Sequence, residues 1–97
     1  MMLVVVAYDV NTETEAGRRR LRRVARVCQG KGQRVQKSVF ECLVDAAQWV
    51  RLRQELVREI DAAGDSLRFY FLGDNWRNRV EHVGANESYD PQGPLVI

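Results

Sequence analysis

The sequence predicts one α+β domain whose elements follow the order strand, helix, two strands, helix, strand. Three observations support this order. A short apolar run rich in β-branched residues opens the chain, and two segments with helical periodicity each begin at a capping signal. Segments that alternate between apolar and polar residues lie between and after these helices. At 97 residues the chain has the length of one domain with a small core, which dimerisation would enlarge.

The first predicted strand lies within residues 3–10 and contains one acidic side chain. Residues 3–8 are apolar or aromatic, Asp9 comes directly after them, and the polar segment 11–14 ends the run. A run of this kind is typical of a buried strand, which would place Asp9 at the end of the sheet. A buried charge needs a partner, and a metal ion is one candidate. The alternative is that Asp9 caps a loop or helix by accepting backbone N–H groups.

The first predicted helix has one packing face and one basic face. Thr12 and Glu15 have the spacing of a capping box, which predicts a helix start near Glu13. The helix is expected to end at residues 29–30, where Gly30 supplies a left-handed cap. At 100° per residue, apolar residues gather on one side and arginines on the other. The packing residues are Leu21, Val24, Ala25 and Cys28, and the opposite arginines are Arg19, Arg22, Arg23 and Arg26.

Together with a fifth arginine that borders the packing face, these arginines form what we call the arginine row: Arg18, Arg19, Arg22, Arg23 and Arg26. Such a row is either a solvated helix face or a binding surface for a polyanion. Because like charges repel at helical spacing, the row favours the polyanion. For Arg18 there is a second interpretation, in which it forms an ion pair that anchors the loop after Asp9.

The charge distribution also indicates a nucleic-acid partner. The net charge of +2 hides an asymmetry, because residues 1–44 carry nine Lys or Arg against four Asp or Glu, whereas residues 45–97 carry six against nine. Thirteen of the fifteen cations are arginine. Since the planar guanidinium binds phosphate through two hydrogen bonds and stacks on bases, the basic half is the candidate binding half.

The middle of the chain predicts a strand pair and a second helix. Segment 34–44 is rich in Val and Phe and fits two pairing strands or one bent strand. Asp45 and Gln48 repeat the capping spacing, and Gly64 ends the helix that they begin. Its apolar stripe consists of Trp49, Leu52, Leu56 and Ile60.

The last part of the chain predicts further strands. Residues 67–72 alternate, residues 73–75 form a turn, and residues 79–83 alternate again. We expect an apolar extra strand at residues 95–97, behind the turn-forming tail. The domain is therefore expected to span residues 1–83, with residues 84–97 as a C-terminal tail.

This order of elements is the split βαβ pattern of ferredoxin-like domains, a βαββαβ sandwich. Two helices cover only one face of such a sheet. The first strand nevertheless offers apolar side chains to both faces, so the uncovered face needs a partner. We expect a two-fold homodimer through this face, with the tail pairing with the partner subunit as an edge strand.

Several classes of protein are not supported. The longest apolar run is far shorter than the ~20 residues that span a bilayer, which predicts no membrane association and a cytoplasmic location. Cys28 and Cys42 match no zinc spacing, and His82 is the only histidine. The two cysteines are therefore expected to be reduced core residues.

Three segments in order resemble the small CRISPR-associated protein of spacer acquisition, the Cas-two family. These are Val4-Val5-Val6-Ala7-Tyr8-Asp9-Val10, then residues 17–24 with their arginines, then Gly32-Gln33-Arg34-Val35-Gln36-Lys37-Ser38-Val39-Phe40-Glu41. Residues 72–76 and 89–95 resemble the variety found in subtype I-C systems. The resemblance spans nearly the whole chain.

The resemblance implies a ferredoxin-like homodimer that, together with the larger CRISPR integrase, holds duplex DNA for insertion into the repeat array. It also implies a Mg²⁺-dependent endonuclease acting on single-stranded RNA or duplex DNA, with Asp9 as the metal ligand at the dimer axis. The alternative is a non-catalytic DNA-binding adaptor in which Asp9 is not a catalytic ligand.

Three residues are candidates for supporting roles at this site. Tyr8 and Phe40 either stack on bases or belong to the core. Ser38 is either a small strand residue or a contact to a metal-bound water. Because one carboxylate per subunit holds Mg²⁺ only weakly, we expect slow catalysis at best.

Overall fold

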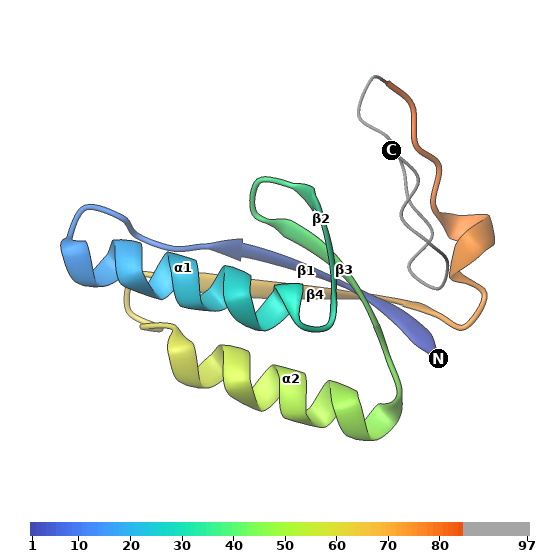
Figure 1. Cartoon of the computed structure of the whole chain (residues 1–97), viewed down its shortest axis with the longest axis horizontal. Helices are drawn as coiled ribbons and strands as arrows, with labels where there is room; N and C mark the ends of the chain where they lie inside the picture. Colours follow the sequence, from blue (N-terminus) through green and yellow to red (C-terminus); the bar gives the residue numbers. More distant parts are fainter. Residues whose placement is uncertain (85–97) are drawn as a thin grey trace.

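The computed structural model describes residues 1–84, which form one four-stranded antiparallel sheet with both helices on the same face (Figure 1). The strand order is β2-β3-β1-β4, so the first strand lies in the interior of the sheet. The α+β fold class and the ferredoxin-like order of elements are confirmed. The elements are β1 (Met2–Asp9), α1 (Glu15–Gln29), β2 (Gly32–Gln36), β3 (Val39–Val44), α2 (Ala46–Glu59), β4 (Ser66–Gly73) and a 3₁₀ helix, η1 (Trp76–Arg79).

Strand alternation separates the side chains of β1 into two sets, as the sequence predicts. Val4, Val6 and Tyr8 point towards the helices, where they are at most 6% exposed. Val6 pairs with Phe40 of β3 and with Phe69 of β4, so the same face continues across three strands. This face forms the core with the buried residues of both helices: Val24, Ala25 and Cys28 of α1 and Leu52 and Leu56 of α2.

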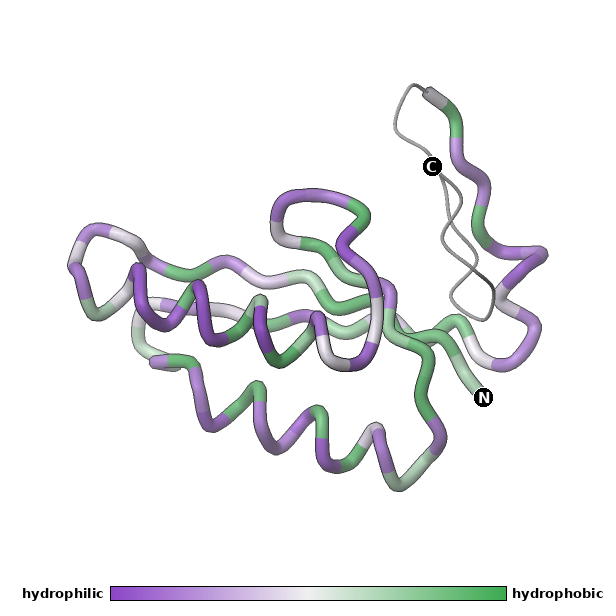
Figure 2. The backbone as a smooth tube through the Cα atoms, viewed as in Figure 1, coloured by the Kyte–Doolittle hydropathy of each residue, from purple (hydrophilic) through white to green (hydrophobic). Residues whose placement is uncertain are grey.

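The sheet face opposite the helices, which we call the open face, is also largely apolar. It carries Val5 and Ala7 of β1 with Val39 and Leu43 of β3, all half-buried, and Tyr70 of β4, which is 48% exposed. Two charged side chains lie among them, Glu41 opposite Val5 and Arg68 opposite Ala7. Figure 2 shows hydrophobic colour along most of β1 and hydrophilic stretches recurring along α1. The described part of the chain leaves this apolar face without a second layer.

Capping residues set where both helices begin. The sequence predicted the cap of α2 correctly and that of α1 incorrectly. Asp45 and Gln48 form the predicted capping box at α2. For α1 the predicted pair Thr12 and Glu15 is wrong, because Thr14 is the N-cap and its hydroxyl accepts a hydrogen bond from the Gly17 N–H at 3.0 Å. The backbone carbonyl of Asn11 lies so close to Gly17 that no Cβ fits there, which fixes where the helix begins.

Two further expectations about chain ends and turns are corrected. Gly30 has a φ of −69° and does not supply a left-handed cap, because α1 ends in a right-handed turn that continues into β2. Gly64 does not end α2, which already stops at Glu59. The segment 34–44 is two strands, joined by a turn at residues 37–38, so the pairing-strand alternative is confirmed.

The predicted strand at residues 79–83 is absent from the described structure. Gly73, with a φ of +74°, turns the chain away from the sheet, and η1 follows with Trp76 buried. Arg79 donates a hydrogen bond to the carbonyl of Leu72 at 3.1 Å, which holds this turn against β4. The predicted extra strand and tail fall on residues 85–97, which lie outside the described residues.

The cysteine prediction is confirmed, since Cys28 and Cys42 are free and fully buried. A hydrogen bond with Cys42 and burial both raise the pKa of the Cys28 thiol, which makes it a poor nucleophile or metal ligand. Within residues 1–84 no helix is long and apolar enough to cross a membrane.

Candidate nucleic-acid interface and metal site

Asp9 is the last residue of β1 and lies opposite Ser66 of β4. Alternation along β1 places it on the open face with Val5 and Ala7. Its side chain is exposed, so the expectation of a buried charge that requires a partner is wrong for the single chain. Among residues 1–84, none donates a hydrogen bond to this carboxylate, and the capping alternative is not observed. Asp9 is therefore a free carboxylate at the end of the open face.

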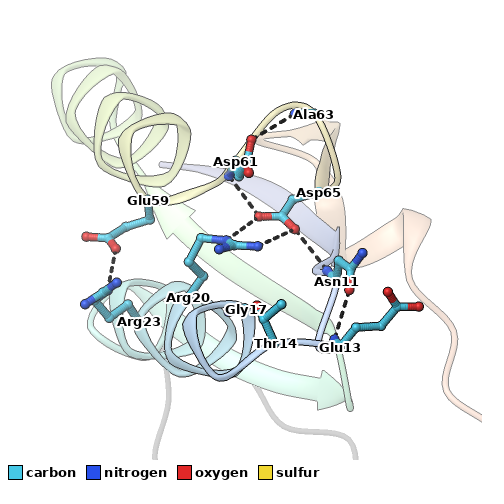
Figure 3. Close-up of polar contacts among 10 residues, drawn as sticks. All are labelled: Asn11, Glu13, Thr14, Gly17, Arg20, Arg23, Glu59, Asp61, Ala63 and Asp65. Carbon is cyan, nitrogen blue, oxygen red and sulfur yellow. Dashed lines mark hydrogen bonds and ion pairs between the residues drawn. The ribbon is translucent and has the colours of Figure 1, made fainter.

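The capping role that the sequence left open for Asp9 belongs to Asp65 (Figure 3). The Asp65 side chain is fully buried and accepts backbone hydrogen bonds from Asn11 at 2.9 Å and Asp61 at 2.8 Å. Its partner is Arg20, whose Nε lies 2.8 Å from Oδ2 and whose second nitrogen lies 3.4 Å from Oδ1. One carboxylate thus connects the β1–α1 loop, α1 and the α2–β4 loop.

These contacts determine the protonation of Asp65. The guanidinium of Arg20 is the largest influence and, with the backbone N–H groups of Asn11 and Asp61, lowers the pKa of Asp65 to about 2 from an ordinary 3.8. Burial opposes this shift but is the smaller effect. Asp65 is therefore ionised and paired at neutral pH, and it cannot serve as a second metal ligand beside Asp9.

The arginine row is exposed along α1, as predicted. Only one of its members forms an ion pair with a described residue, since the Nε of Arg23 lies 3.0 Å from a carboxylate oxygen of Glu59 on α2. Arg18 holds the loop after Asp9, but through a hydrogen bond to the carbonyl of Thr12 at 3.1 Å and not through the predicted ion pair. The remaining members of the row, Arg19, Arg22 and Arg26, have no acidic partner among the described residues and present their charge to solvent.

Other acidic side chains do not complete a metal site around Asp9. Glu13 and Glu15 are exposed at the start of α1, and no group of three possible metal ligands occurs in the described part of the chain. Within residues 1–84, Asp9 is therefore not part of a cluster of metal ligands. A lone carboxylate binds Mg²⁺ weakly, and water and a second subunit would have to complete the coordination.

Of the candidate supporting residues, Tyr8 and Phe40 lie on the helix side of the sheet, and Ser38 lies in the β2–β3 turn. Tyr8 and Phe40 are buried, with ring centroids 6.2 Å apart, which confirms their interpretation as core aromatics. The carbonyl of Ser38 accepts a hydrogen bond from the Tyr8 N–H at 3.1 Å. Ser38 lies in a turn, so its interpretation as a small strand residue is wrong. Tyr8 lies on the opposite face of the sheet from Asp9, so these residues do not gather around the Asp9 carboxylate.

The Asp65–Arg20 pair generates a prediction about acid stability. Because the folded-state pKa of about 2 lies below the ordinary 3.8, ionised Asp65 stabilises the fold above that ordinary value, and the stabilisation is lost as the pH falls towards 2. We expect Asp65→Asn to lower the Tm by several degrees at pH 7 and by progressively less towards pH 2, measured by circular dichroism. Asp61→Asn, in the same loop but with an exposed carboxylate, is the matched control. A difference from wild type that is constant with pH would contradict this assignment.

Comparisons with known proteins agree with this architecture. Residues 2–80 match the family model described as CRISPR associated protein Cas2. The CRISPR-associated endoribonuclease Cas2 of Chlorobaculum tepidum is 67% identical over 96 residues, which is 99% of this chain and 100% of that protein. The crystal structure of Streptococcus pyogenes Cas2 at pH 6.5 superposes with a TM-score of 0.75 at 58% identity, covering 86% of this chain and 100% of that one.

A more distant likeness concerns a chain of a partial Cas6-RT-Cas1–Cas2 complex, with a TM-score of 0.66. It covers 100% of this chain and 96% of that chain at 21% identity, a level that shows the fold alone. The family match over residues 2–80 and the identity to the Chlorobaculum protein carry the assignment. This chain belongs to the CRISPR associated protein Cas2 family.

Proposed function

We propose that the protein acts in CRISPR adaptation, where a homodimer bound to the CRISPR integrase holds duplex DNA for insertion into the repeat array. The observation that carries this proposal is the exposed arginine row on α1, most of which has no acidic partner within residues 1–84. The presence of Cas1 beside a Cas2 chain in the distant structural neighbour supports an integrase of the Cas1 type as the partner.

The open face supports the homodimer. Its centre contains half-buried Val5, Ala7, Val39 and Leu43, with Glu41 opposite Val5 and Tyr70 at the β4 side. An apolar sheet face of this kind is stabilised when a second layer covers it, and a second copy supplies a layer of matching chemistry. Because Asp9 lies at the end of the same face, a two-fold axis near this end would bring the two Asp9 carboxylates into one site.

Phosphate binding by the arginine row would be independent of base sequence. Guanidinium groups on an exposed helix bind phosphate oxygens, and each contact releases counterions from the duplex. The ion pair between Arg23 and Glu59 weakens the contribution of that member of the row, so Arg19, Arg22 and Arg26 are expected to carry most of the affinity.

We also propose a nuclease activity that depends on Mg²⁺. The Chlorobaculum relative is named an endoribonuclease, and Asp9 is an exposed carboxylate at the end of the open face that fits a Mg²⁺ ligand. When bound, Mg²⁺ polarises a phosphate oxygen and lowers the pKa of a coordinated water. Asp9 and its copy would hold the ion, and the arginine row would hold the strand, with either single-stranded RNA or duplex DNA as substrate.

The alternative is a purely structural adaptor, and one observation favours it. Asp65, the acidic side chain next to the residue that pairs with Asp9, is fully buried and bound to Arg20. A two-metal phosphodiesterase site requires several carboxylates, which this part of the chain does not offer. Catalysis is therefore expected to be slow, and DNA binding is the function that does not depend on Asp9.

Cleavage tests the role of Asp9. If Asp9 is the metal ligand, wild type cleaves labelled single-stranded RNA or duplex DNA only with Mg²⁺, and Asp9→Ala reduces the rate at least about a hundredfold without lowering the Tm. Asp74→Ala, an exposed acid at the other end of the sheet, serves as a control purified in parallel. Equal cleavage by wild type and Asp9→Ala would indicate a contaminating nuclease and leave the adaptor alternative.

Salt dependence tests the arginine row. We expect Arg19→Ala to weaken duplex DNA binding equally for unrelated sequences and to reduce the slope of log Kd against log salt concentration by about 0.9. Arg51→Ala, an exposed arginine on α2, should leave this slope unchanged. Titrations at several salt concentrations measure both variants, and an unchanged slope for Arg19→Ala would remove it from the binding surface.

A further inference from the structure

A cavity of about 400 Å³ lies between α1 and the β2–β3 hairpin, on the helix side of the sheet. It is distinct from the open face that carries Asp9, because Tyr8 and Arg34 of its lining belong to the helix-side set of strand residues. Its volume lies within the range of roughly 300–1,000 Å³ that small-molecule sites occupy. We call this cavity the hairpin groove.

The hairpin groove is strongly basic. Arg22 and Arg26 of α1 and Arg34 and Lys37 of the hairpin line it, and its lining includes no acidic side chain. None of these four cations forms an ion pair with a residue in the described range 1–84. Their combined charge is therefore available to an anion.

One of these cations is held in place before any ligand arrives. The guanidinium carbon of Arg34 lies 5.1 Å from the ring centroid of Phe40, which is fully buried. This cation–π contact holds the Arg34 side chain over the core, at the wall of the groove. A donor fixed in this way loses little conformational entropy when it binds phosphate.

The floor of the groove contains an unpaired polar group. The Tyr8 hydroxyl is buried, with the residue 6% exposed, and no described residue forms a hydrogen bond with it. A buried hydroxyl without a partner is unfavourable, and a ligand oxygen would satisfy it.

We infer that the hairpin groove binds a single nucleotide, with its phosphate on the four cations and its sugar or base against Tyr8, Leu21 and Ala25. Inorganic phosphate would leave the apolar part of the cavity unfilled, whereas a duplex is too wide to enter it. The nucleotide is either free or the terminal nucleotide of a single strand. Arg22 and Arg26 are shared with the arginine row, but Tyr8, Arg34 and Lys37 belong to the groove alone, so this inference does not depend on duplex binding.

Calorimetric titration of the full-length protein with adenosine 5′-monophosphate tests the inference. We expect saturable binding in the millimolar range or tighter, and binding of adenosine that is weaker by about tenfold or more because the phosphate contacts are lost. A short 5′-phosphorylated single strand distinguishes the two sources. If it displaces the nucleotide, the groove accepts strand ends, and if it does not, the groove accepts free nucleotides.

Two variants locate the binding. Lys37→Ala, in the exposed turn, should lower nucleotide affinity about tenfold without changing the Tm. Tyr8→Phe keeps the ring and removes the unpaired hydroxyl, so it should weaken nucleotide binding several-fold while maintaining or raising the Tm. Arg19→Ala, outside the groove, is the control for nucleotide binding. Lys37→Ala should keep its duplex binding, which would show that the two sites are separate.

The inference is overturned if the nucleotide shows no saturable binding, if adenosine binds as tightly as its monophosphate, or if Lys37→Ala binds the nucleotide as wild type does. These outcomes do not bear on the arginine row, whose test is the salt dependence of duplex binding. Weaker duplex binding by Arg19→Ala together with unchanged nucleotide binding would support the two sites independently.

Discussion

The buried carboxylate of Asp65 determines how the basic helix sits on the sheet. It lies between three segments that are far apart in sequence, and each gives it a hydrogen bond: the loop after β1 through Asn11, α1 through Arg20 and the loop before β4 through Asp61. Breaking one member of a buried ion pair leaves the other charge without compensation, so the arrangement is stable only as a whole. The direction of the arginine row follows from this contact, because Arg20 belongs to the same helical turns as Arg19 and Arg22.

Two acids near the same end of the sheet thus have opposite roles. Asp65 is buried, ionised and saturated with donors, whereas Asp9 is exposed and has no donor among residues 1–84. A carboxylate that the fold does not use is available for a metal, a partner subunit or solvent. The two proposed functions differ in their use of Asp9. Duplex binding needs only the arginine row, whereas cleavage would need Asp9 from each of two subunits.

Periodicity and capping chemistry were sufficient to predict the elements whose signals are local. The apolar run of β1, the stripe of α2 and the capping box at Asp45 each depend on neighbouring residues, and the structure confirms them. The N-cap of α1 was misplaced because Thr12 and Thr14 offer the same hydroxyl, and only the close approach of Asn11 to Gly17 selects between them. Residues 79–83 alternate like a strand, but the left-handed turn at Gly73 directs them away from the sheet.

For the functional surfaces, too, local sequence patterns predict only part of what the structure contains. The arginine row follows from helical spacing, yet within the run Arg18-Arg19-Arg20 nothing local distinguishes the residue that is committed to a buried acid. Asp65 is 45 residues away from Arg20, and no pattern along the chain links them. The hairpin groove was missed for a similar reason, since the interpretation of Tyr8 as a core aromatic is correct and its unsatisfied hydroxyl becomes apparent only when β1, α1 and the hairpin are assembled.

The central claim is that the open face joins two copies of the chain and thereby pairs their Asp9 residues. Sedimentation equilibrium of the full-length protein at micromolar concentration tests it most directly, with Val5→Asp at the centre of the open face and Val50→Asp on the exposed side of α2 as its matched control. The account predicts a dimer for wild type and for Val50→Asp, and a monomer for Val5→Asp. A monomeric wild type, or a dimer that survives Val5→Asp, would contradict it.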